Sequence, residues 1–182
     1  MNFSYSNNSG KIHLEINNLD KEFLYINSLS RGIGNNDLGL DRGQLGNTRI
    51  VFFTKRGNKI LMVQPNTRYV SNSDNYLENK AVEEAFARSV LFSFEIIEEK
   101  NNNYIIDLTP LLMNDAHGVA QRLRFSNSGN YSLNKSMSAI ELDRTKAFPE
   151  NIEFDVILTF TGNPMGNLVR SVTPTASNIT VN

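Results

Sequence analysis

The two histidines of the chain, His13 and His117, are the side chains best suited to metal binding or proton transfer, and they lie far apart in the sequence. A catalytic zinc ion usually takes three protein ligands, and the HExxH pattern that supplies two of them is absent. The chain also has no cysteine, so it offers neither thiolate ligands nor disulfides. The residues therefore predict no catalytic residue, no metal site and no cofactor site in this chain.

His117 belongs to the sequence Asp115-Ala-His-Gly118, which comes directly before apolar residues at helical spacing. An aspartate at a helix start accepts hydrogen bonds from free backbone N–H groups and complements the helix dipole. A catalytic Asp–His pair is the functional alternative. We favour the structural interpretation, in which Asp115 caps a helix.

A glycine-rich segment, residues 31–47, separates two strand-like runs and contains Gly32, Gly34, Gly39, Gly43 and Gly46. Long irregular loops are uncommon inside compact domains, and ordering glycine is costly in entropy. We therefore expect the loop to be held, either by its own domain or by a neighbouring one. Self-docking would use apolar anchors at Ile33, Leu38, Leu40 and Leu45, with the Asp41 or Arg42 side chain bonded to loop backbone.

The alternating positions Asn35, Asp37, Gly39 and Asp41 of this loop resemble the early oxygen ligands of a calcium-binding loop. The closing glutamate of such a loop is missing, because Gly46 stands twelfth from Asn35. Turn formation by Asn, Asp and Gly is the favoured interpretation.

A second polar segment, Arg144-Thr-Lys-Ala-Phe-Pro149, places two cations and an aromatic before a strand-like run. It is interpreted either as a polar turn or as a docking patch for another domain. In the docking interpretation Phe148 is the anchor, Arg144 offers its planar donors, and Lys146 adds charge. Together with Asp41, Arg42 and Gln44, these residues are the candidates for interdomain contact or loop anchoring.

Strands dominate the predicted elements. Alternation predicts a strand over residues 11–16 with Ile12, Leu14 and Ile16 on one face. Further strands or hairpins are expected at residues 22–29, 49–64, 94–108, 131–142, 151–160 and 178–181. The pattern predicts an α+β fold, mainly antiparallel sheet with one well-defined helix and one or two short helices in residues 109–125.

The well-defined helix is expected at about residues 76–91, with Asn75 as its cap. Leu77, Val82, Phe86 and Val90 recur at helical spacing, whereas charged residues occupy the other face. We expect this helix to lie on the sheet through Val82, Phe86 and Val90.

Length and composition fit one non-catalytic domain over residues 1–182, expected to be a fragment of a longer chain with residues 1–10 as a frayed lead-in. The net charge of −1 gives no electrostatic case for nucleic acid or an anionic membrane as partner. No apolar run reaches the roughly 18 residues of a transmembrane segment, and the N-terminus lacks the features of a signal peptide.

Three stretches carry a resemblance to a known family: residues 23–44, ending in Asp41-Arg-Gly-Gln44; residues 115–120; and residues 138–149. The tail Leu168-Val-Arg-Ser-Val-Thr-Pro174 agrees with it. The sequence is similar, over about residues 11–182, to the domain of unknown function that precedes the catalytic domain of large exported bacterial zinc-dependent, metzincin-like metalloproteases.

This resemblance implies a non-catalytic accessory domain whose partner is the downstream peptidase domain of the same polypeptide. Zinc is then expected in that catalytic domain, and the location is expected to be periplasmic or extracellular. The alternative is a stand-alone peptide- or glycan-binding β-rich module, and a stand-alone enzyme is the least favoured hypothesis. Oligomeric state and protease substrate stay open.

Overall fold

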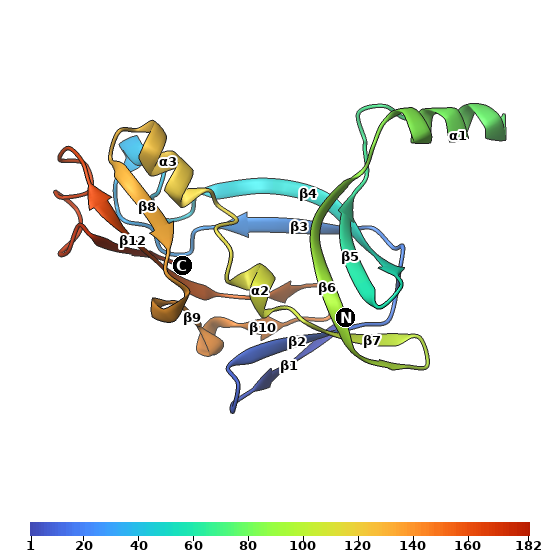
Figure 1. Cartoon of the computed structure of the whole chain (residues 1–182), viewed down its shortest axis with the longest axis horizontal. Helices are drawn as coiled ribbons and strands as arrows, with labels where there is room; N and C mark the ends of the chain where they lie inside the picture. The colour runs from blue at the N-terminus through green and yellow to red at the C-terminus, as the bar shows by residue number, and fades with distance from the viewer. The chain divides into compact units, whose positions relative to one another are not determined.

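A computed structural model describes all of residues 1–182 (Figure 1). The chain forms two compact units, each built from separate stretches of sequence. Unit 1 contains Met1 and residues 13–25 and 49–107, and unit 2 contains residues 2–12, 26–48 and 108–182. Antiparallel strand pairs build both units, which confirms the expected β-rich α+β class.

A seven-stranded sheet has the order β1-β2-β7-β6-β5-β4-β3. Its strands are β1 (Asn2–Ser6), β2 (Lys11–Ile16), β3 (Phe23–Ser28), β4 (Leu45–Arg56), β5 (Lys59–Gln64), β6 (Ser89–Lys100) and β7 (Asn103–Asp107). The predicted strand at residues 11–16 is confirmed, with Ile12, Leu14 and Ile16 all buried. Residues 2–6 form β1, although the sequence predicts a frayed lead-in there.

The core of unit 1 follows from the apolar runs of the β4–β5 hairpin. Val51, Phe52 and Phe53 are consecutive and all buried, as expected for a strand covered on both faces. Phe53 contacts Phe23 and Phe94 through ring pairs with centroids 5.1 Å and 6.2 Å apart. Aromatic packing therefore joins three strands of this unit.

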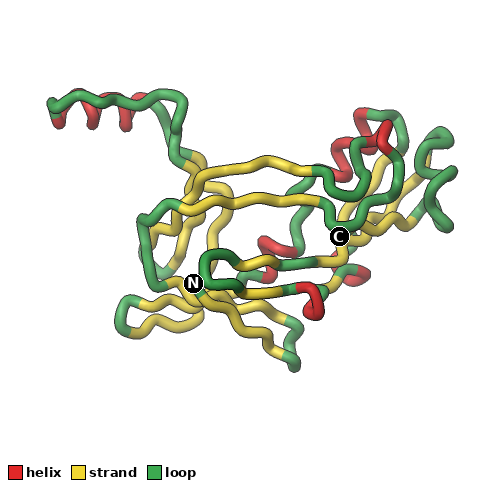
Figure 2. Tube along the Cα trace, turned by 180° about the vertical axis from the view of Figure 1, so that it is seen from behind, coloured by secondary structure: helices red, strands yellow, loops and turns green.

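Helix α1 (Tyr76–Ala85) contradicts its predicted packing. It begins where expected, with the Asn75 side chain accepting from the Leu77 N–H, but it ends before Phe86, and β6 starts at Ser89. None of its residues is buried, and Phe86 and Val90 are 36% and 57% exposed. Figures 1 and 2 show α1 extending away from β5 and β6, the strands that precede and follow it.

Unit 2 contains a smaller sheet in which β12 (Val156–Pro164) is central. It pairs with β8 (Gly129–Leu133), β9 (Ala139–Ile140) and β13 (Asn178–Val181), while β10 (Lys146–Ala147) pairs with β11 (Ile152–Glu153). The core of unit 2 combines this sheet with α3 (Val119–Phe125) and the glycine-rich loop. Its members are Leu29, Ile33, Leu38, Leu40, Val119, Leu123, Tyr131, Leu158, Phe160, Val169, Ile179 and Val181.

The remaining helical elements of unit 2 are short: α2 (Thr109–Leu112) and three 3-10 turns, η1 (Asn36–Leu38), η2 (Lys135–Met137) and η3 (Leu142–Arg144). None of the helices combines the length and the apolar character that a bilayer crossing requires. The strand expected at residues 151–160 is divided into β11 and β12, because the Asp155 N–H donates to the Thr145 hydroxyl instead of to a neighbouring strand.

Candidate functional site

The glycine-rich loop is inserted into the core of unit 2. Ile33, Leu38 and Leu40 are only 7%, 4% and 0% exposed, so three of the four expected anchors are buried. The fourth, Leu45, is 66% exposed and is not an anchor. The structure thus supports docking of the loop onto its own unit.

Local geometry explains two glycines of the loop, Gly32 and Gly39. A Cβ at Gly32 would lie 2.1 Å from the Leu40 carbonyl oxygen, and the neighbouring Ile33 N–H donates to that oxygen at 2.8 Å. Gly39, with φ +60°, ends η1 in the left-handed region, which glycine adopts at low cost. These positions require glycine for local geometry.

The calcium-like alternation has a local explanation as well. The Asn35 side-chain oxygen accepts from the Asp37 N–H and caps η1, while its Nδ2 donates to the Leu168 carbonyl. Both polar atoms of Asn35 are therefore engaged within unit 2, one inside the loop and one at Leu168. No group of three or more His, Cys, Asp or Glu side chains suited to hold a metal ion occurs in residues 1–182.

The structure brings the Asp41 and Gln44 side chains together, and Arg42 takes no part in this contact. Gln44 Nε2 donates to Asp41 Oδ1 at 3.1 Å, so Asp41 bonds a side chain and not the loop backbone as predicted. Backbone bonds between Leu29 and the pair Gly43 and Gln44 close the loop against the end of β3. Arg42 is exposed.

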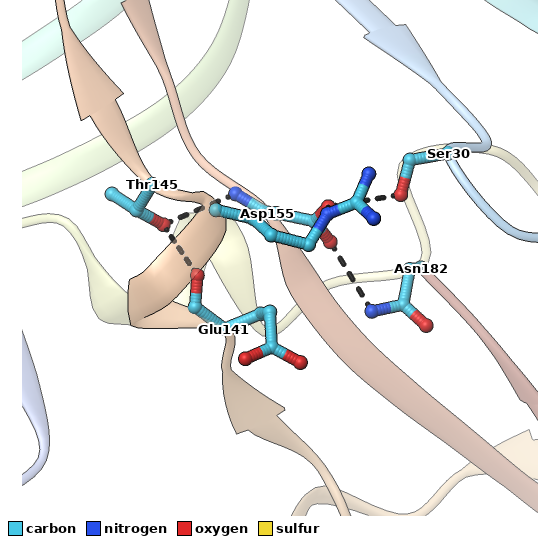
Figure 3. Close-up of polar contacts among 6 residues, drawn as sticks. Ser30, Glu141, Thr145, Asp155 and Asn182 are labelled. Carbon is cyan, nitrogen blue, oxygen red and sulfur yellow. Dashed lines mark hydrogen bonds and ion pairs between the residues drawn. The ribbon is translucent and has the colours of Figure 1, made fainter.

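Asp155 lies at the centre of a polar network that includes Ser30 and Asn182 (Figure 3), and it also pairs with Arg144. Arg144 Nε lies 2.6 Å from Asp155 Oδ2, which also accepts from the Ser30 hydroxyl at 2.9 Å. Asn182 Nδ2 donates to the other carboxylate oxygen at 3.2 Å. Asp155 thus joins η3 to the start of the glycine-rich loop and to the end of β13, and Arg144 is already paired within unit 2.

Lys146 is exposed in β10, and Phe148, which is 50% exposed, follows in the connection between β10 and β11. No hydrogen bond or ion pair connects them to residues 41–44. Of the six predicted contact residues, Asp41, Gln44 and Arg144 have partners inside unit 2, whereas Arg42, Lys146 and Phe148 face solvent.

The Asp115 carboxylate caps α3, as the sequence predicts. It accepts from the N–H groups of Val119 at 2.7 Å and Ala120 at 2.9 Å. Beside it, His117 Nδ1 lies 3.3 Å from Asn27 Nδ2, and His117 Nε2 is buried without a hydrogen-bond partner. Burial, and then the positive charge of Arg122, lower the pKa of His117, while Asp115 opposes the shift.

An exposed apolar region of unit 1 includes Phe86 and Val90, two of the residues that the sequence predicts to pack on the sheet. We define the α1 surface as Tyr69, Val70, Tyr76, Leu77, Phe86 and Val90, which are between 36% and 72% exposed. Tyr69 and Phe86 stack with centroids 4.1 Å apart at the base of the helix. The helical apolar spacing located several of these residues, but spacing does not reveal what covers them.

An open depression of about 260 Å³ in unit 1 lies at the β6–β7 turn and is lined mainly by polar residues: Glu15, Glu98, Lys100, Asn101, Asn103 and Ile105. Glu15 accepts from Asn103 Nδ2 at 3.2 Å. Its carboxylate is therefore engaged by a neighbour in the same unit.

Comparison with known proteins identifies one family. The model of a domain of unknown function, DUF5117, matches residues 43–182, from within the glycine-rich loop to the end of the sequence. No curated protein and no solved structure matches the chain. Because the match covers well over half of the sequence, the chain belongs to the DUF5117 family of domains of unknown function.

Proposed function

We propose that this chain is a non-catalytic accessory domain of an exported bacterial zinc-dependent metalloprotease, packed beside the peptidase domain of the same polypeptide and shaping its substrate cleft. The resemblance of residues 23–44, 115–120 and 138–149 supports the protease association. In this proposal the zinc ion and the catalytic glutamate belong to the peptidase domain. The structural observation that carries the proposal is the α1 surface.

The α1 surface has the chemistry of a protein-binding element. Tyr76 and Leu77 are 72% and 70% exposed, and fully burying a large apolar side chain is worth roughly 1.5–3 kcal/mol. Tyrosine and other aromatic residues are also typical anchors of protein interfaces. A partner that covers these side chains would bury apolar surface that the isolated chain leaves exposed, and this burial would favour binding.

Helix α1 also lacks support from its own unit. Isolated helices shorter than about 12–15 residues are marginal in water, and α1 has 10 residues, none of them buried. Local contacts hold it: the Asn75 cap, the Lys80–Glu84 ion pair at 3.7 Å, and an ion pair between Arg88 and Glu83. Exposed pairs of this kind contribute little, so a covering partner would stabilise the helix substantially.

The test is association with the peptidase domain encoded in the same reading frame, produced as a separate protein. Calorimetric titration should show binding that Leu77→Asp weakens at least tenfold, because a carboxylate would be buried in an apolar contact. Phe125→Asp is the matched control, since Phe125 is 75% exposed at the end of α3 and lies outside the α1 surface.

Equal binding by both variants and the wild type would reject the α1 surface as the contact. Absence of any peptidase domain in the reading frame, together with peptide or glycan binding by the chain alone, would support the alternative binding module. Loss of binding with Phe125→Asp alone would move the contact to unit 2.

A further inference from the structure

His117 lies in unit 2 between the turn that starts α3 and the strand β3. Its Nδ1 faces Asn27 Nδ2 of β3 at 3.3 Å. Asn27 itself lies against the backbone of β4, because a Cβ at Gly46 would come within 2.1 Å of Asn27 Nδ2. The His117–Asn27 pair therefore connects α3 to the two strand ends that flank the glycine-rich loop.

Arg122 extends this connection into the loop. Its Nε donates to the His117 carbonyl and its Nη1 donates to the Gly39 carbonyl, both at 3.4 Å. A Cβ at Gly39 would lie 2.9 Å from Arg122 Nη1, so the guanidinium rests directly on the loop backbone. A movement of the His117 turn would shift the donor that contacts the loop.

The geometry suits a neutral imidazole. With Nδ1 accepting from Asn27, the proton of neutral His117 resides on Nε2, which is buried and has no acceptor. A second proton on Nδ1 would place two donors face to face unless the Asn27 amide rotated. It would also place a positive charge on a partly buried ring whose Nε2 has no hydrogen-bond partner, which is unfavourable.

The charged groups that face His117 do not compensate for that cost. Arg122, on α3, repels the imidazolium, and β3 presents only the uncharged Asn27 amide. Asp115, in the same turn, favours the charged form, but its carboxylate is committed to the N–H groups of Val119 and Ala120. Desolvation and Arg122 together outweigh Asp115.

We propose that the His117–Asn27 pair is an acid-sensitive clamp that holds the glycine-rich loop through Arg122 and loosens when His117 is protonated. The inference does not depend on the proposed function, since it uses contacts within unit 2 alone. The clamp is closed above the ordinary range of histidine titration and open below it. As the pH falls, the glycine-rich loop, residues 31–47, would then be the first part of unit 2 to lose its ordered structure.

The direction in which stability changes with pH follows from the direction of the pKa shift of His117. Because the pKa of folded His117 is lowered from its ordinary value of about 6.5, the unfolded state binds a proton first as the pH falls. The stabilisation is fully present above about pH 6.5 and is lost as the pH falls through that value toward the folded pKa. Loop opening should follow the same curve.

The test combines a titration with hydrogen exchange on the full chain. His13→Gln leaves His117 as the one histidine, so its imidazole NMR signal gives its pKa directly. Protection factors of the loop amides, corrected for intrinsic exchange, are then compared at about pH 7.5 and about pH 5, which bracket the ordinary histidine pKa. We expect a pKa below 6.5 and several-fold lower protection at acid pH, confined to the loop and the His117 turn.

His117→Asn is the matched variant, because its side-chain oxygen can accept from Asn27 near the position of Nδ1 but cannot take up a proton in this range. We expect its loop protection to be independent of pH. A wild-type pKa at or above 6.5, or acid loosening that persists in His117→Asn, would overturn the proposal. If His117→Asn fails to fold, the wild-type titration and the regional pattern of exchange decide it.

Discussion

The glycine-rich loop of unit 2 and helix α1 of unit 1 reverse the roles that their sequences suggest. The loop is rich in glycine and has little regular structure, yet Ile33, Leu38 and Leu40 are all buried in the core. Helix α1 has an N-terminal cap, apolar spacing and ion pairs, yet it buries none of its residues. Regular structure and burial are therefore separate properties here, and only burial marks where the fold obtains its stability.

The largest expected effect contrasts two leucines, one from each region. Leu40→Ala removes a side chain with 0% exposure and should cost about 2–5 kcal/mol of unfolding free energy. Leu77→Ala, at 70% exposure, should change it by less than about 0.5 kcal/mol. Urea denaturation of both variants measures this contrast, and equal losses would show that the two regions do not differ as described.

Substitutions in the Asp155 network test how much Arg144 contributes to the stability of unit 2. Asp155→Ala leaves the Ser30 hydroxyl and the Asn182 amide without their acceptor, so we expect a loss of about 1–3 kcal/mol. Arg144→Ala should cost at most about 1 kcal/mol, because its side chain is 44% exposed and solvent screens the pair. Thermal unfolding of the two variants shows which substitution costs more stability. A larger loss for Arg144→Ala would contradict this expectation.

Phe86→Ala sharpens the comparison at the base of α1. A fully buried phenylalanine would cost about 3–5 kcal/mol on truncation. At 36% exposure, with one stacked ring contact to Tyr69, we expect about 0.5–1.5 kcal/mol. A denaturant titration that gives more than about 3 kcal/mol would place the helix against the body of unit 1 in solution.

The smallest expected effect is on hydrolytic activity. The isolated chain should show no hydrolysis of peptides or esters above a buffer control, because the sequence supplies no ligand set of the kind that catalytic zinc requires. Incubation with zinc and then with a chelator should change nothing. Cleavage by the pure chain that the chelator abolishes would make the chain an enzyme and end the accessory-domain proposal.

Local chemistry in the sequence determined several features correctly. The alternation of residues 11–16 gave strand β2 and its buried face, Asn75 caps α1, and the Asp115 carboxylate caps the start of α3. These features depend on contacts within a few residues or on the two-residue period of a strand. Such information is present in any short window of sequence.

Tertiary structure decided which apolar residues are covered. Periodicity predicts that Val82 and Phe86 share a buried helix face, but α1 ends at Ala85, Val82 is only partly buried and Phe86 is exposed. In the loop, Leu40 is buried and Leu45 is exposed, although both are leucines beside glycine-rich turns. The physical reason is that burial depends on what long-range packing brings opposite a side chain, and no local pattern encodes that neighbour.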